Sequence, residues 1–175
     1  LLESVLRANL SRYYTPERVS ELVARWVTGG RSRESVLDVA CGSGRLLEAV
    51  VEQMEEPEHA LGVDINETAT TIARGRMRES SVEDLDIWTE DFLDIRDQLS
   101  VNGQTTLSGT ESPPPDRGFD CVVAHPPVGV APNSNEDQVP SSVPFRRLEH
   151  GFVNGACKAL AESGRGCFLL ARSSV

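Results

Sequence analysis

Two glycines, two positions apart and preceded by an acidic residue, form the most distinctive motif in this sequence. The stretch reads Asp38-Val39-Ala40-Cys41-Gly42-Ser43-Gly44. Glycines allow a tight turn and let a ligand approach the backbone closely, so the motif is typical of a nucleotide-binding turn between a strand and a helix. The spacing alone is also compatible with a turn that binds nothing.

A second acidic residue, Asp64, follows Gly44 by 20 positions and closes a predicted strand beside Ile65. A carboxylate there can accept hydrogen bonds from two ribose hydroxyls. Leu47 stands where a dinucleotide-binding turn has its third glycine, and Asp38 would repel a phosphate but attract an ammonium. S-adenosylmethionine carries an ammonium, a ribose and an adenine, and is therefore favoured over a dinucleotide.

Asp91 and Phe92 follow the third predicted strand. With this ligand, Asp91 would accept a hydrogen bond from the adenine amine and Phe92 would pack on the ring. Without the other motifs, a solvated acidic turn would be the better interpretation.

His125-Pro126-Pro127-Val128 follows a further predicted strand. Two consecutive prolines fix the backbone and remove two N–H donors. Rigidly held carbonyl oxygens suit recognition of an NH₂ group, which donates hydrogen bonds. A rigid turn leaving the strand is the alternative.

The elements that position these residues alternate along the chain. Such alternation predicts an α/β fold, a Rossmann-like parallel sheet with helices on both faces. The motifs all lie at or just after strand ends, so we expect one shared cleft. Helices are predicted from Thr15-Pro16 to Gly29-Gly30 with Thr15 as N-cap, over 46–54, from the N-cap Asn66 to about Arg78, and over 148–160. Strands are predicted over 35–40, 60–64, 86–89, 119–124 and 166–171.

The domain organisation predicted from these patterns has two parts. Residues 1–30 form an N-terminal helical segment that includes Tyr13-Tyr14-Thr15-Pro16, and residues 31–175 form the core. Within the core, residues 102–118 are rich in Gly, Ser, Thr and Pro and predict a flexible insertion, and residues 128–144 predict a polar loop.

In this order, the motifs resemble the adenine-N6 DNA methyltransferases, most closely the modification subunit of type I restriction-modification systems. The resemblance covers about 11–170, and the aromatic-Thr-Pro element before the glycine turn is its specific part. It rests on Tyr13-Tyr14-Thr15-Pro16, Val36 to Gly44, Gly62-Val63-Asp64-Ile65-Asn66, Asp91-Phe92, and Phe119-Asp120 leading to Pro126-Pro127.

The resemblance implies a role for each matching residue. Tyr14, Thr15 and Pro16 would line the methionine end of S-adenosylmethionine, Asp64 would bind ribose, and His125 to Val128 would face a substrate amine on a base extruded from DNA. The turn around the cofactor would consist of Asp38, Ala40, Cys41, Gly42 and Gly44, with Ile65, Asp91 and Phe92 holding the nucleoside.

This sequence departs from the family pattern at the tetrapeptide, which in the family opens with Asn, Asp or Ser and closes with an aromatic residue. Here His125 and Val128 hold those positions, and Arg12 replaces the usual glycine before the aromatic-Thr-Pro element. Three hypotheses follow: an active DNA adenine methyltransferase, a degenerate relative that binds cofactor or a partner without catalysis, and a methyltransferase acting on a protein amide.

The net charge of −10 is unusual for a protein that binds DNA without a partner, because neutralising the DNA phosphates needs a basic surface. We therefore expect DNA contact through a specificity subunit or a segment outside this sequence. The acidic balance, with Lys158 as the single lysine, is typical of a salt-rich cytoplasm. Scattered cysteines and histidines predict free thiols and no metal site, and no apolar run predicts a membrane span.

Overall fold

The computed structural model describes residues 15–29, 34–101, 115–128 and 147–170. Tyr14, Arg12, residues 102–114 of the predicted insertion and residues 129–144 of the predicted loop lie outside the described residues.

Five parallel strands form one sheet in the order β3-β2-β1-β4-β5. Leu37 of β1 pairs with Leu61 of β2 on one side and with Val122 of β4 on the other. Their apolar residues are buried because helices cover both faces. The strands are β1 (Ser35–Asp38), β2 (His59–Asp64), β3 (Asp84–Thr89), β4 (Phe119–Ala124) and β5 (Leu160–Phe168).

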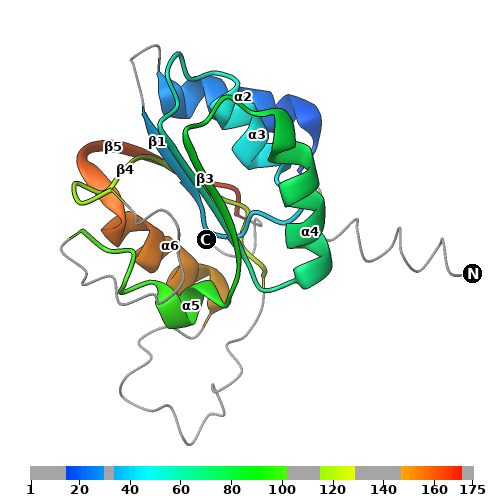
Figure 1. Ribbon diagram of the computed structural model, residues 1–175. Helices are drawn as coiled ribbons and strands as arrows, with labels where there is room; N and C mark the ends of the chain where they lie inside the picture. The colour runs from blue at the N-terminus through cyan, green and yellow to red at the C-terminus, as the bar shows by residue number, and fades with distance from the viewer. Residues whose placement is uncertain (1–14, 30–33, 102–114, 129–146, 171–175) are drawn as a thin grey trace, which may run out of the picture.

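The helices divide between the two faces of the sheet, with α2, α3 and α4 on one side and α5 and α6 on the other (Figure 1). This confirms the predicted α/β architecture. The described helices are α2 (Glu17–Thr28), α3 (Arg45–Val51), α4 (Glu67–Arg76) with the 3-10 turn η2 (Met77–Glu79), α5 (Phe92–Ile95) and α6 (Leu148–Lys158).

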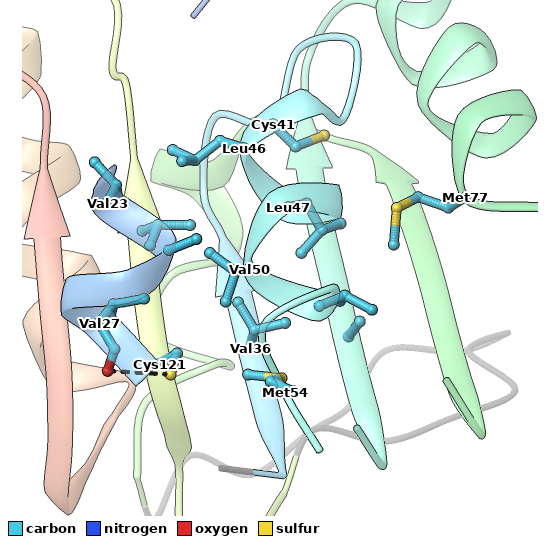
Figure 2. Close-up of a cluster of buried hydrophobic side chains, with 14 of the residues drawn as sticks. Val23, Val27, Val36, Cys41, Leu46, Leu47, Val50, Met54, Met77 and Cys121 are labelled. Atoms are coloured by element: carbon cyan, nitrogen blue, oxygen red, sulfur yellow. Dashed lines mark hydrogen bonds between the residues drawn. The ribbon is translucent and has the colours of Figure 1, made fainter. Parts of the chain in front are cut away.

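Each face has its own hydrophobic cluster. Under α2, α3 and α4, the side chains of Val27, Val36 and Leu47 interdigitate, and the Cys121 thiol donates to the Val27 carbonyl at 3.7 Å (Figure 2). On the opposite face, Phe92 and Phe152 pack with ring centroids 5.4 Å apart. The two clusters hold the strands in register and therefore fix where their carboxyl ends lie.

Several predicted boundaries are corrected by the structure. Pro16, not Thr15, is the N-cap of α2, which begins at Glu17, and Gly29 ends that helix in the left-handed conformation at φ 61°. Asn66 caps α4 as predicted, since its side chain accepts from the Ala69 N–H at 2.9 Å. Strand β1 ends at Asp38 rather than residue 40.

The largest local error lies between α6 and β5. The spacing of Ala156 and Leu160 predicts continued helix, whereas α6 ends at Lys158 and Leu160 already pairs with Phe119. The carbonyls of Lys158 and Ala159 accept from the Val101 and Phe119 N–H groups, and these tertiary bonds stop the helix. The short helix α5 was not predicted.

Within the residues that the structure describes, no helix is both long and apolar enough to cross a membrane.

Candidate active site

A cleft of about 700 Å³ opens at the carboxyl ends of β1, β2 and β4. In the sheet, β1 lies between β2, which follows it in the sequence, and β4, which comes later. The strand order therefore reverses at the carboxyl end of β1, and parallel sheets bind ligands at such a switch point. Its volume is in the range of small-molecule sites. The predicted residues that line it are Thr15, Asp38, Ala40, Cys41, Gly42, Asp64, Ile65, Asp91, Phe92, His125, Pro126, Pro127 and Val128.

Asp64 is held in one orientation by two backbone amides. The Gly42 N–H donates to Oδ2 at 2.8 Å, and the Asn66 N–H donates to Oδ1 at 2.9 Å. Each carboxylate oxygen has a second lone pair, so Asp64 can still accept from two ligand hydroxyls. The neighbouring Ile65 side chain is 70% exposed and gives the cleft an apolar surface suited to a planar ring.

Asp38 is a buried carboxyl at the end of β1, with a side chain only 1% exposed. Burial, opposed by the hydrogen bond from the Ala40 N–H and reinforced by the charge of Asp64, raises the pKa of Asp38 to about 7. A carboxylate that is costly to ionise gains most from a cation beside it. The site therefore favours a positively charged ligand group at this point.

The glycine turn is fixed from outside by helix α4. Gly44 has φ 78°, and a Cβ there would stand 3.0 Å from the Cβ of Ala73 and 3.2 Å from its Cα. Arg76 donates from Nε to the Ser43 carbonyl at 2.8 Å and pairs with Glu48 at 2.9 Å. Gly44 is thus required by the packing of α3 against α4, and it does not line the cleft.

Cys41 lies in the turn with its thiol buried against the sheet. A Cβ on Gly62 would stand 3.0 Å from the Cys41 sulfur and 2.8 Å from Ile87 Cδ1, so the sulfur fills the space that Gly62 leaves. Burial, with Asp38 and Asp64 nearby, holds the pKa of this thiol far above its usual range. Cys41 is therefore a packing residue of the cleft wall and not a nucleophile.

Asp91 and Phe92 line the cleft just after the end of β3. Asp91 is the N-cap of α5, and its Oδ1 accepts from the Leu93 N–H at 2.9 Å, leaving the other oxygen for a ligand. The Phe92 ring is only 2% exposed and most of it contacts Phe152 and the core.

His125 contacts Thr15 in the lining of the cleft. Thr15 Oγ1 lies 3.2 Å from His125 Nδ1, a contact between residues 110 positions apart that the sequence gives no sign of. Partial burial lowers the pKa of His125, which favours the neutral ring. Pro127 and Val128 are exposed at the mouth, Val128 by 51%.

Some predicted residues do not line the cleft, and some residues that line it were not predicted. Pro16 and Gly44 do not line the cleft, and Tyr14 lies outside the described residues. Seven lining residues were not predicted, and they lie within or beside the motifs or on α6, namely Val39, Arg45, Leu46, Glu90, Leu93, Leu148 and Phe152. Four of them could have been recognised from their positions in the sequence, because Arg45 and Leu46 directly follow the glycine turn and Glu90 and Leu93 flank Asp91-Phe92.

No metal site is present among the described residues, where no three His, Cys, Asp or Glu side chains gather closely enough to hold an ion. All four cysteines are free.

Comparison with known proteins assigns this chain to a family. The profile of the family described as N-6 DNA Methylase matches residues 4–175. The methylase subunit of the type I restriction enzyme MpnII from Mycoplasma pneumoniae is 28% identical over 128 residues, which are 68% of this chain and 22% of that protein. The type II methyltransferase M.VspI from a Vibrio species is 25% identical over 163 residues, 90% of this chain and 36% of that protein.

Solved structures agree on the fold. The methyltransferase subunit of a type I restriction-modification system from Streptococcus thermophilus superposes with a TM-score of 0.65 at 21% identity, over 89% of this chain and 33% of that one. A SAM-dependent O-methyltransferase from Thermotoga maritima gives 0.58 at 11% identity, over 92% and 46%. This chain therefore spans between about a fifth and a half of the length of these proteins.

Proposed function

Because this chain belongs to the N-6 DNA methylase family, we propose that it is the S-adenosylmethionine-binding core of a methyltransferase that acts on the N6 amine of adenine in DNA. The observation that carries the proposal is the meeting of the glycine turn, Asp64 and the diproline in one cleft. Its relatives' names, a methylase subunit and a methyltransferase, support the reaction class.

The residues present fit this cofactor. When bound, S-adenosylmethionine would supply a methyl group activated by a sulfonium. Asp38, whose buried carboxyl favours a cation, would bind the ammonium, and Asp64 would accept from the ribose hydroxyls. The free oxygen of Asp91 and the exposed face of Ile65 would hold the adenine.

The diproline segment would receive the substrate amine. Pro126 and Pro127 have no N–H to compete for it, so carbonyl oxygens and the neutral His125 ring are the available acceptors. With Val128 in place of an aromatic residue, the target base loses a stacking contact that is worth about 1–3 kcal/mol.

The departure at this tetrapeptide favours a second candidate, a degenerate relative that binds the cofactor or a partner without turnover. A methyltransferase acting on a protein amide is a third. DNA would reach the cleft through a specificity subunit or a segment outside this sequence, which the net charge of −10 supports. The proposed domain limits, cytoplasmic location and salt-rich environment stay predictions.

Thermal unfolding with S-adenosylmethionine tests the cofactor assignment. At a hundred times the dissociation constant, the ligand would stabilise the fold by about 2.7 kcal/mol, on the order of 5–10 °C in Tm at this length. Asp64→Ala should lose most of the shift, whereas Asp116→Ala, an exposed acid at the opposite end of β4, should keep it. No shift for the unsubstituted protein at saturating ligand, in low and high salt, would refute the assignment.

Turnover is tested separately with tritium-labelled cofactor, in the presence of the specificity subunit or further segment through which we expect DNA to be bound. We expect labelled methyl groups in DNA and not in added protein, and a higher rate for the double variant His125→Asn, Val128→Tyr. Cofactor binding without transfer by either protein would favour the second candidate, and label in protein alone would favour the third.

A further inference from the structure

Thr15 and His125 form a side-chain pair that joins the N-terminal segment to the diproline segment. The Thr15 hydroxyl oxygen lies 3.2 Å from His125 Nδ1, and Thr15 is buried at 6% exposure while His125 lines the cleft. Both residues precede a proline, Pro16 and Pro126, which restricts the backbone of each to extended conformations. The backbone of each residue is therefore restricted, while the His125 side chain is exposed at the cleft.

The contact has two possible hydrogen arrangements, and they give His125 opposite chemistry. In a neutral imidazole one ring nitrogen carries the hydrogen and the other has a lone pair. If Nδ1–H donates to Thr15 Oγ1, Nε2 is a hydrogen-bond acceptor. If the Thr15 hydroxyl donates to Nδ1, Nε2 carries the hydrogen and becomes a donor.

We propose that Thr15 is a positioning residue that keeps the hydrogen of His125 on Nδ1, so that Nε2 accepts a hydrogen bond from the substrate amine. The inference rests on the proposed function, because an amine substrate presents hydrogens and needs an acceptor. The threonine hydroxyl can accept from Nδ1–H, and while it does so Nε2 keeps its lone pair for the substrate amine.

This pairing gives the departure from the family pattern a chemical meaning. An amide at position 125 would offer an oxygen acceptor without any helper, whereas an imidazole offers an acceptor only in one tautomer and one ring orientation. Thr15, which is 110 positions from His125 in the sequence, supplies both constraints.

Nitrogen NMR of the unliganded protein tests the proposal without any turnover. The chain has three histidines, His59, His125 and His150, and a His125→Gln variant identifies the signals of the ring in question. We expect two-bond nitrogen–proton spectra near pH 7 to show the hydrogen of His125 on Nδ1. A ring with its hydrogen on Nε2 would overturn the proposal.

Two substitutions at Thr15 separate positioning from a merely structural role. Thr15→Val keeps the branched shape and removes the hydroxyl, and should leave a mixture of the two tautomers. Thr15→Ser keeps the hydroxyl and should restore the single tautomer. An unchanged tautomer in Thr15→Val, with a native circular dichroism spectrum, would overturn the proposal, and if that variant does not fold, the serine variant and the unsubstituted chain still decide.

Failure of this inference differs from failure of the proposed function. Cofactor binding with the hydrogen on Nε2 would overturn only the role of Thr15. The absence of cofactor binding would remove the proposed function and, with it, the substrate amine that gives the tautomer its purpose. A single Nδ1–H tautomer that is lost in Thr15→Val and restored in Thr15→Ser supports the inference.

Discussion

Replacing Gly44 by alanine should destabilise the protein substantially, because two separate penalties meet at that residue. The backbone of Gly44 has φ 78°, a left-handed conformation that costs a residue with a Cβ about 1–2 kcal/mol. The added Cβ would also stand 3.0 Å from Ala73 Cβ and 3.2 Å from Ala73 Cα. Since the nearest atoms belong to a backbone and a short side chain, the helix must move, which costs about 1–3 kcal/mol.

Together, and after a small gain from a stiffer unfolded chain, these terms give a loss of roughly 2–4 kcal/mol. For a chain of 175 residues that is a decrease in Tm on the order of 10 °C. Urea unfolding followed by circular dichroism measures the free energy directly, and differential scanning calorimetry gives the Tm.

Gly75 is the matched control, because it lies in the same region without either penalty. It is exposed inside α4, and a Cβ there has no neighbour within 4 Å. Gly75→Ala should therefore stabilise the protein by about 0.5–1 kcal/mol through helix propensity. A Gly44→Ala variant as stable as the unsubstituted protein, beside the expected gain at Gly75, would refute the packing of α4 on the glycine turn.

Two further outcomes are expected. The affinity for S-adenosylmethionine should rise about tenfold per pH unit up to pH 7 and level off above it, because the ligand ammonium selects the ionised form of Asp38, whose pKa burial raises to about 7. Calorimetric titration at several pH values measures this slope, which should vanish in Asp38→Asn. A flat profile for both proteins would contradict the expectation. Asn66→Ala should cost about 1 kcal/mol in urea unfolding, since the Ala69 N–H loses its cap, and an unchanged midpoint would contradict that.

The sheet and the position of the cleft could be predicted because they depend on local patterns. Short apolar runs bounded by turn residues, such as Phe119–Ala124, become buried strands wherever helices cover both faces. Strands of a parallel sheet end at one edge, so motifs that follow strands must meet there. The Asn66 cap is equally local, as it needs only its own side chain and the amide of Ala69.

The details that could not be predicted depend on contacts between distant residues. The end of α6 is set by Val101 and Phe119, whose amides take carbonyls that a longer helix would use. Glycine is needed at position 44 because Ala73 of α4 packs against it. Sequence spacing does not show how close α4 lies to the glycine turn. The Thr15–His125 contact depends on how α2 is placed against β4, which only the packed structure defines.

The two ends of the cleft differ in how far they follow the family pattern, and that difference bears on function. At the cofactor end, the charge of Asp64 raises the cost of ionising Asp38, while the Gly42 amide of the turn is used to orient Asp64. Such an arrangement lowers stability unless a cationic ligand offsets it, and costly charges of this kind are typical of binding sites.

At the substrate end, His125 and Val128 change what the cleft can recognise without disturbing the acids or the glycine turn. The buried carboxyl of Asp38, with its pKa raised to about 7, is costly to ionise, and a cationic ligand would offset that cost. We therefore expect cofactor binding to be the property on which the active and the non-catalytic candidates agree. Only the fate of the methyl group separates them, and the hydrogen on the His125 ring is the structural variable that decides whether an amine can bind.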